Sequence, residues 1–216
     1  MPVVKIKQIN EDTKILIWYI REDSQFFESH LRELYGQPYP WLAMADKRKR
    51  EFLATRYLIQ LGLPPGQSVA HLTKNENGSP RLSETPYCFG ISHTSEYVSC
   101  VISTHQAGCD IERFQERILR LSDRFMTPSD QTWANDDHRL AKTHLIWGIK
   151  ESAFKTWGKK RIDWKRHIRI DPIEWDPDKG HFTGTIGNDS GMLHFYGEYE
   201  YFPQFLFVWS IETKSQ

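Results

Sequence analysis

Two long helix-compatible segments restrict this chain to folds that pack helices on sheets. Residues 45–63 repeat apolar side chains at helical spacing and end at Gly62, just before two prolines. Residues 137–157 form the second segment. Before it, the motif TPSD supplies another helix start, in which Thr127 can cap the backbone. A shorter helix is expected at residues 23–35.

Short runs rich in β-branched and aromatic residues surround both helices and are predicted to be strands. They lie at 14–20, 68–73, 87–93, 97–103 and 108–114, then at 167–171, 181–187, 192–201 and 205–212, with a turn-rich loop at 74–82. The order of strand, helices and strands is followed by helices and strands again. We therefore expect an α+β fold of two similar halves, 1–112 and 113–216, each with a long helix on a small antiparallel sheet.

The charge balance argues against a general nucleic-acid or membrane-surface binder. Lys plus Arg and Asp plus Glu both total 28, so the formal net charge is zero. No apolar run reaches the roughly 18 residues of a membrane helix, and charged residues near the N-terminus interrupt any signal-peptide core. Three cysteines without a C-x-x-C spacing favour neither a disulfide framework nor a zinc site. We expect a cytoplasmic globular protein without nucleic-acid or membrane partners.

The motif GCDIERF places two carboxylates on one face of a predicted strand. Side chains alternate along a strand, so Asp110 and Glu112 point the same way and lie about 7 Å apart. They repel each other unless a cation neutralises them, and Mg²⁺ prefers such oxygen ligands. The alternative is that both side chains simply face solvent.

The motif WGIKESAFK lies in the second long helix and places Glu151 one turn before Lys155. As an exposed ion pair, this spacing contributes only a few tenths of a kcal/mol. Trp147 shares their stripe, however, and a surface ion pair needs no large aromatic neighbour. A catalytic Glu would benefit from a rigid, partly desolvated position.

Two further groups could bind an anion. Ser92 and His93 lie at the end of a predicted strand, where phosphate-contacting donors are common, although a lone His is often just a satisfied polar residue. Lys47, Arg48 and Arg56 lie along the first long helix, and the arginine fork suits phosphate. Such charge runs are also typical of solvated helix faces.

Taken together and in this order, these motifs resemble those of the 4′-phosphopantetheinyl transferase superfamily. The succession is a basic helix, a loop with G-x-P, F-x-I-S-H, G-x-D-I-E and W-x-x-K-E-S-x-x-K, from about residue 45 to about 160. The length and the doubled layout resemble the monomeric Sfp-type branch of that family.

The resemblance implies transfer of the phosphopantetheine arm of coenzyme A to a serine of an apo acyl or peptidyl carrier protein. Asp110, Glu112 and Glu151 would surround Mg²⁺, with Glu151 also the base for the serine, directly or through water. Lys155 would pair with the pyrophosphate. The released product would be adenosine 3′,5′-bisphosphate.

The family's coenzyme A contacts map onto the first half of the chain. His93 and Ser92 would hold the 3′-phosphate or the nearby ribose. Arg56, with Lys47, Arg48 or Arg50, would grip a coenzyme A phosphate and cover the adenine. A cytoplasmic monomer that meets an acidic carrier only transiently is the expected state.

Three positions depart from the family's usual pattern. Gly90 stands where Asn is frequent, Ser79 where a phosphate-binding Lys is frequent, and Lys160 where a second Gly is frequent. These departures leave open a degenerate coenzyme A or carrier-binding protein without turnover. The carboxylate motifs are also compatible with a metal enzyme that cuts phosphodiesters, although its broad basic face is missing here, and with an α+β domain that has unrelated ion pairs.

A basic segment follows the second long helix directly. It contains Lys159, Lys160, Arg161, Lys165 and Arg166. We expect it to help dock the acidic carrier, because carrier recognition in this family is largely electrostatic.

Overall fold

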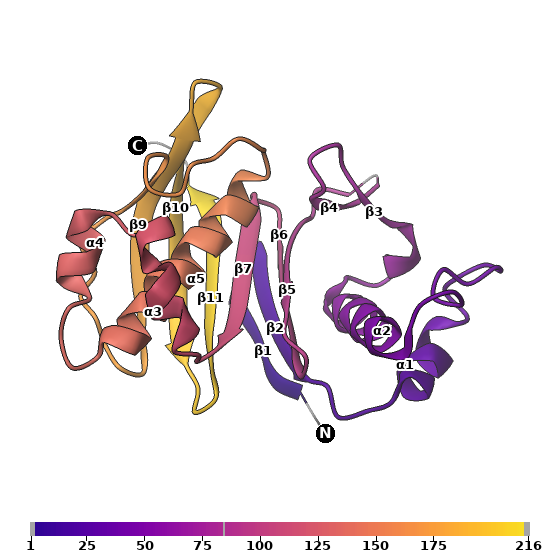
Figure 1. The fold of residues 1–216 in the computed structure, drawn as a ribbon. Coiled ribbons are helices and arrows are strands. Elements are labelled where there is room, and N and C mark those ends of the chain that lie inside the picture. The colour runs from indigo at the N-terminus through magenta and orange to yellow at the C-terminus, as the bar shows by residue number, and fades with distance from the viewer. Residues whose placement is uncertain (1–2, 84, 214–216) are drawn as a thin grey trace. The chain divides into compact units, whose positions relative to one another are not determined.

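The protein divides into two compact units, Met1–Thr104 and His105–Gln216, in a computed structural model that describes residues 3–83 and 85–213 (Figure 1). The boundary lies after Thr104 rather than after residue 112 as expected. The physical reason is strand pairing: residues 107–113 hydrogen bond to the last strand of the chain, so the D-x-E motif belongs to the second unit.

The first unit is a six-stranded antiparallel sheet with two helices. Its strands follow the order β1-β2-β6-β5-β4-β3. Their bounds are β1 Val3–Asn10, β2 Thr13–Tyr19, β3 Leu72–Lys74, β4 Pro80–Leu82, β5 Cys88–His93 and β6 Tyr97–Ser103. The helices are α1 Ser24–Leu31 and α2 Asp46–Gly62, with a 3₁₀ turn, η1, at Val69–His71. Leu53 and Leu58 of α2 pack into a core with Leu16 of β2 and Val98 of β6.

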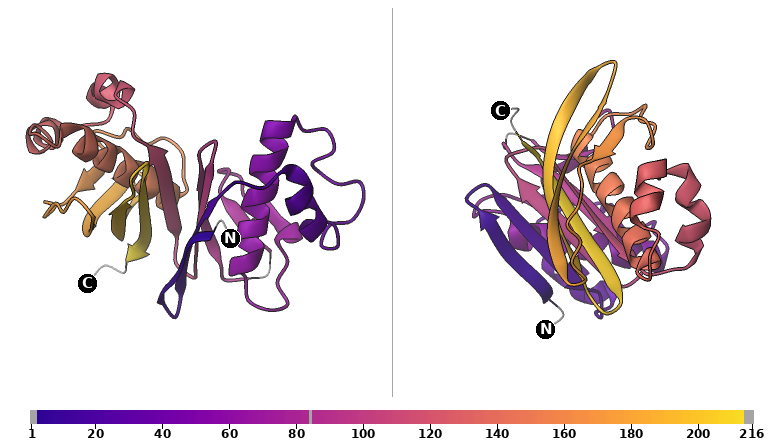
Figure 2. Two further views of the ribbon diagram at one scale, coloured as in Figure 1. Left: turned by 90° about the horizontal axis from the view of Figure 1, so that it is seen from below. Right: turned by 90° about the vertical axis from the view of Figure 1, so that its left-hand side faces the viewer.

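The second unit has a five-stranded antiparallel sheet in the order β7-β11-β10-β9-β8. The strands are β7 Ala107–Arg113, β8 Ile168–Ile170, β9 Lys179–Asn188, β10 Gly191–Tyr201 and β11 Phe205–Thr213. The helical elements are α3 Arg117–Leu121, η2 Ser122–Arg124, α4 Pro128–Trp133 and α5 Arg139–Trp157. Helix α5 lies along this sheet (Figure 2), and its Leu145, Ile149 and Ala153 share a core with β10 and β11. The predicted α+β class with a helix on each antiparallel sheet is confirmed.

Local hydrogen bonds explain where the elements begin and end. Thr127 and Asp130 form a reciprocal capping box at the start of α4, as the TPSD motif predicts. Helix α5 ends at Gly158, which adopts the left-handed conformation with φ +62°. The GNDSG stretch forms the turn between β9 and β10, also as expected.

Several predicted elements differ from those found. Strand β1 was not expected, although Lys5 and Lys7 alternate with the apolar Val4 and Ile6. It pairs with β2 at the edge of the sheet, where lysines are common. The predicted strand 68–73 instead begins as η1, because the Ser68 hydroxyl accepts the Ala70 N–H. Helix α1 ends at Leu31 rather than residue 35, and α3 was not expected.

The loop predicted at 74–82 is a short hairpin of β3 and β4. Its turn is fixed by the Asn75 carboxamide, which accepts the backbone N–H groups of Asn77 and Ser79, and by Gly78 at φ +90°. In the described part of the chain, no helix is both long and apolar enough to cross a membrane.

Candidate functional site

A close approach of β7 to α5 builds the candidate site in the second unit. A Cβ atom at Gly108 would lie 2.1 Å from the Ser152 carbonyl oxygen and 2.7 Å from the Thr156 nitrogen, so only glycine fits. Beside this contact, the Thr156 hydroxyl lies 2.8 Å from the Ser210 hydroxyl of β11. The backbones of β7 and α5 are therefore in direct contact at Gly108, and a hydroxyl pair joins α5 to β11 next to it. The G in G-x-D-x-E was visible in the sequence, but its steric role was not.

This approach brings the carboxylates of β7 to the ammonium group on α5. Lys155 Nζ donates to Asp110 Oδ1 at 2.9 Å and to the Cys109 carbonyl at 2.9 Å. Its distance to Glu151 Oε2 is 3.9 Å, across one helical turn. Asp110 is buried, whereas the side chains of Glu151 and Lys155 are 24% and 27% exposed and remain accessible to a ligand.

Glu112 completes the acidic group. Burial, reinforced by the carboxylates of Asp110 and Glu151, raises the pKa of Glu112 to about 7, although Lys155 and Arg117 act in the opposite direction. Burial likewise raises the pKa of Glu151, with Lys155 opposing it and Asp110 adding to it. These carboxylates lie near enough to one another to compete for positive charge.

The pKa of Lys155 is also raised, but by its neighbours and against the effect of burial. Burial by itself would lower the pKa of Lys155, but Asp110, Cys109 and Glu151 raise it above its ordinary value. The side chain is therefore an ammonium ion at neutral pH. A fixed positive charge among three carboxylates can receive an anionic group.

The chemistry of the acidic group suits a hard divalent cation, since it consists of oxygen donors whose charges repel one another. In the side-chain arrangement of the described residues, however, no three His, Cys, Asp or Glu side chains are grouped closely enough to hold a metal ion. Lys155 instead supplies the positive charge that Asp110 contacts. Asp110 and Glu151 thus both lie beside the Lys155 ammonium group. Their predicted convergence with Glu112 on a metal ion stays a prediction.

The buried Lys150, which precedes Glu151 in the sequence, bonds α5 to three segments outside the helix. Lys150 Nζ donates to the Phe125 carbonyl at 2.6 Å, to Asp130 Oδ2 at 3.0 Å and to the Trp164 carbonyl at 3.2 Å. Its side chain is 1% exposed. No role was expected for Lys150, because a Lys adjacent to a candidate catalytic Glu gives no signal in the sequence that it points inward.

The cations predicted on the first long helix have different environments in the first unit. Lys47 and Arg48 are exposed in the first turns of α2. Arg56 is half-buried, with its guanidinium 3.4 Å from the centre of the Phe52 ring. Lys49 is bound at 2.6 Å to the buried Glu28, which also pairs with Arg32. The hydrogen bond from Lys49, assisted by Arg32 and opposed by burial, lowers the pKa of Glu28 to about 2.

The end of β5 lies beside α2. His93 Nδ1 is 4.0 Å from Glu51 Oε2, and the His93 side chain is about half exposed. Ser92 is buried at the preceding position. Because Glu51 lies one turn from Lys47 and Arg48 on α2, the structure groups His93 with the predicted cations. It also places a carboxylate among them that sequence reasoning missed.

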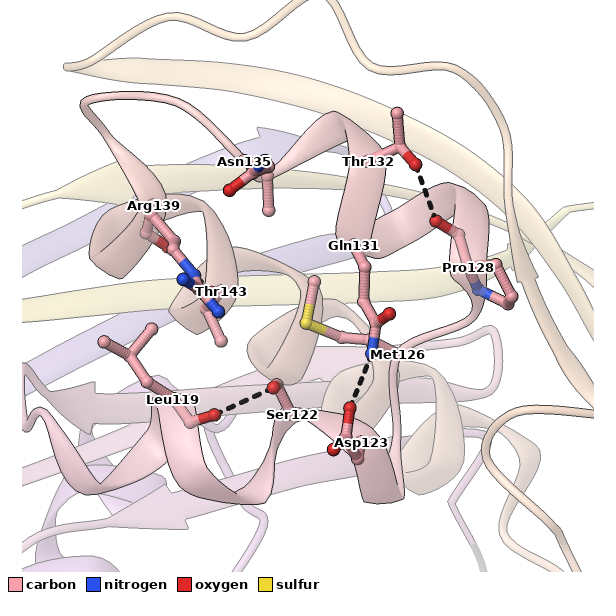
Figure 3. Close-up of a pocket in the computed structure, with 11 residues that line it drawn as sticks. Leu119, Ser122, Asp123, Met126, Pro128, Gln131, Thr132, Asn135, Arg139 and Thr143 are labelled. Carbon is pink, nitrogen blue, oxygen red and sulfur yellow. Dashed lines mark hydrogen bonds between the residues drawn. The ribbon is translucent and has the colours of Figure 1, made fainter.

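A separate cavity of about 540 Å³ lies between η2, α4 and the first turns of α5 (Figure 3). Its lining includes none of Asp110, Glu112, Glu151 and Lys155. The polar lining groups bond locally: Gln131 donates to Asp123 at 2.7 Å, and the Ser122 hydroxyl donates to the Leu119 carbonyl at 2.8 Å. We assign this cavity no part in the site.

Comparison with known proteins gives a match over the same segment. The family model for the 4′-phosphopantetheinyl transferase superfamily matches residues 106–201, which include both β7 and α5. The chain is 34% identical over 112 residues to the 4′-phosphopantetheinyl transferase gsp of Aneurinibacillus migulanus, covering 50% of this chain and 46% of that protein.

Two further relatives come from Bacillus subtilis. Identity to the 4′-phosphopantetheinyl transferase Sfp of strain 168 is 29% over 120 residues, or 54% of this chain and 51% of that protein. Identity to another 4′-phosphopantetheinyl transferase of the species is 30% over 88 residues, or 39% of each chain. This chain thus spans about half the length of the curated relatives it matches.

Proposed function

Because the chain belongs to the 4′-phosphopantetheinyl transferase superfamily, we propose that it transfers 4′-phosphopantetheine from coenzyme A to a serine of an apo acyl or peptidyl carrier protein. The observation that carries this proposal is the contact of Lys155 with Asp110 and Glu151. It lies within the segment that the family model matches.

Lys155 is proposed to hold the pyrophosphate of coenzyme A. The side chain is charged at neutral pH and partly accessible, so it can exchange a carboxylate contact for a phosphate oxygen. Its charge would also offset the negative charge that develops on the leaving phosphate. Asp110 keeps the ammonium group in place.

Glu151 is proposed to take the proton of the carrier serine. A raised carboxyl pKa makes a stronger base at the pH where the group is still ionised. As the proton passes to Glu151, the serine oxygen bonds to the phosphorus bearing the pantetheine arm. The bond from that phosphorus to the bridging oxygen breaks, and adenosine 3′,5′-bisphosphate leaves with the electron pair.

Asp110, Glu112 and Glu151 are the residues that would hold Mg²⁺. The pKa of Glu112, raised by burial and further by Asp110 and Glu151, supports this, because buried carboxylates that repel each other gain most from a shared cation. Bound Mg²⁺ would supply additional positive charge to the phosphate oxygens.

The first unit is proposed to bind other parts of coenzyme A. Ser92 and His93 would contact the 3′-phosphate or the ribose, and Lys47, Arg48 and Arg56 would contact phosphate and adenine. The exposed Lys47 and Arg48 and the half-exposed His93 are accessible for this role. We further propose that the protein acts as a cytoplasmic monomer and meets its carrier transiently.

The direct test is to mix the protein with coenzyme A, Mg²⁺ and apo acyl or peptidyl carriers and to weigh the carriers by mass spectrometry. We expect the mass of one phosphopantetheine to be added, and the addition to be abolished by EDTA and by Glu151→Gln. Glu116→Gln, which changes an exposed side chain outside the site, is the matched control. Coenzyme A binding without mass gain on any carrier would instead indicate a binding protein without turnover.

A further inference from the structure

The loop between α5 and β8 concentrates positive charge in a chain whose formal net charge is zero. Five of its residues are Lys or Arg and one is acidic over residues 158–167, and all five of these basic side chains are exposed. The basic residues are Lys159, Lys160, Arg161, Lys165 and Arg166. The loop begins at Gly158, directly after the helix that carries Glu151 and Lys155. The loop therefore follows the proposed site residues directly in the chain.

This loop is held in one conformation by bonds along its length. The Trp164 carbonyl accepts from the buried Lys150, and the Trp164 ring packs on Trp147 with centroids 4.9 Å apart. Asp163 accepts the backbone N–H groups of Lys165 and Arg166 at 2.9 and 3.0 Å. A loop that is already ordered loses little conformational entropy when a partner binds.

The basic side chains of the loop differ in how they are used. Lys159 Nζ lies 4.4 Å from the centre of the Trp157 ring, and Lys165 Nζ donates to the Asp123 carbonyl at 3.0 Å. By contrast, the Lys160, Arg161 and Arg166 side chains form no hydrogen bond or ion pair within residues 3–83 and 85–213. These three side chains can pair with a partner without giving up a hydrogen bond or ion pair within the described residues.

Arg161 also carries backbone strain. Its φ of +66° lies in the left-handed region, which favours glycine, and within the described residues it is the one non-glycine residue with positive φ. The Asn188 carboxamide at the β9–β10 turn donates to the Arg161 carbonyl at 3.2 Å and fixes this conformation. An arginine where glycine would be more stable indicates that its guanidinium serves something other than the fold.

We infer that residues 159–166 form a preorganised docking surface for an acidic segment of the protein substrate, with Lys160, Arg161 and Arg166 as its main contacts. This inference rests on the proposed function for the identity of the partner as a carrier. The chain's neutral overall charge disfavours a nucleic-acid partner, which would require a broad basic face. Electrostatic contacts of this kind accelerate encounter and weaken as salt is added.

The test compares matched charge reversals. Lys160→Glu should raise the KM for the carrier about fivefold at low ionic strength and less at high salt. Lys179→Glu, an exposed lysine at the far end of β9 from the Asn188 turn, should change it less than about twofold. The KM for coenzyme A should be unchanged in both variants.

A second variant separates charge from folding. Arg161→Gly removes the guanidinium and relieves the left-handed strain, so its melting temperature should not fall while its carrier KM rises about threefold. A variant that loses carrier affinity without losing stability cannot be explained by a damaged loop. Unchanged carrier KM in Lys160→Glu and Arg161→Gly would overturn the inference, as would a rise in the coenzyme A KM instead.

A binding measurement keeps this result separate from the proposed activity. Calorimetric titration of an apo acyl carrier and an apo peptidyl carrier domain, without coenzyme A, reports docking alone. Weaker binding by Lys160→Glu would support the docking surface even if the wild type transferred nothing, in which case only the proposed function would fail. Absence of wild-type binding to both carriers would reject the docking surface.

Discussion

At the scale of single residues, the site depends on how one ammonium group is shared. Lys155 contacts Asp110 and lies one turn from Glu151, so it neutralises part of a group of three carboxylates. Removing it should leave these acids uncompensated and remove the proposed phosphate contact. We therefore expect Lys155→Met to lower kcat by about 10²- to 10³-fold in the carrier modification assay.

Lys142→Met provides the control for Lys155, because Lys142 is also a largely buried, ion-paired lysine of α5 but contacts Asp136 and the Trp133 and Trp175 rings instead. Its loss should reduce stability and leave kcat largely unchanged. Equal losses of kcat in both variants would contradict a specific role for Lys155.

Glu112 gives a prediction about pH. Its pKa in the folded protein, about 7, lies above its ordinary value of 4.5, so the folded state binds more protons than the unfolded state between these values. The free energy of unfolding should therefore decrease as pH rises from about 4.5 to about 7 and then level off. Glu112→Gln should remove this loss and be about 1–2 kcal/mol more stable than the wild type at pH 8, allowing for solvent screening.

Urea unfolding at pH 5 and pH 8 in the presence of EDTA checks this expectation. The variant and the wild type should differ less at pH 5, where Glu112 is protonated in the folded protein. A variant that is less stable than the wild type at pH 8 would show that Glu112 is stabilised by its neighbours rather than repelled by them.

At the scale of elements, the site depends on the distance between β7 and α5. A methyl group at Gly108 would overlap the Ser152 carbonyl, so Gly108→Ala should push the helix away from the strand that carries Asp110. We expect a loss of stability of about 1–3 kcal/mol from overpacking. We also expect a fall in kcat measured on the folded fraction, because the Lys155–Asp110 contact would lengthen.

Gly197→Ala is the matched control for Gly108→Ala. A Cβ at Gly197 would lie 2.2 Å from the Trp209 carbonyl oxygen, which is an equally severe overlap between β10 and β11. This variant should lose comparable stability, as measured by urea unfolding, while its folded fraction keeps kcat. If both variants lose kcat equally, the spacing of β7 and α5 has no special role.

At the scale of the whole molecule, ligand binding should increase the free energy of unfolding of the protein. A ligand that binds only the folded protein stabilises it by about 2.7 kcal/mol at a concentration 100 times its Kd. Coenzyme A with Mg²⁺ should therefore raise the melting temperature more than either alone, because the acidic group would bind both through the shared cation. Differential scanning fluorimetry with and without EDTA measures this.

Glu112→Gln again supplies a control, because it should keep the stabilisation by coenzyme A alone and lose most of the additional effect of Mg²⁺. If EDTA leaves the wild-type shift unchanged, Mg²⁺ does not take part in coenzyme A binding, and the proposed ligand set is wrong.

Local signals along the chain were enough to predict most elements and the chemical type of the site. Hydrophobic periodicity and capping act between neighbouring residues, so α2, α5, the TPSD helix start and most strands could be predicted. Two predictions failed at the level of single elements. Strand β1 was not expected although Val4, Lys5, Ile6 and Lys7 alternate as strand residues do, and the Ser68 hydroxyl holds the start of the strand predicted at 68–73 in the 3₁₀ turn η1. The D-x-E and E-x-x-x-K motifs also pointed to Asp110, Glu112, Glu151 and Lys155.

Which of these groups meet could be learned only from the packed protein. Asp110 and Lys155 are 45 positions apart, and their contact requires a glycine at 108 that lets a strand reach a helix backbone. The burial that raises the pKa of Glu112 and the inward direction of Lys150 likewise arise from neighbours distant in sequence. Sequence spacing fixes which side chains share an element, whereas packing fixes the distances and the desolvation on which their chemistry depends.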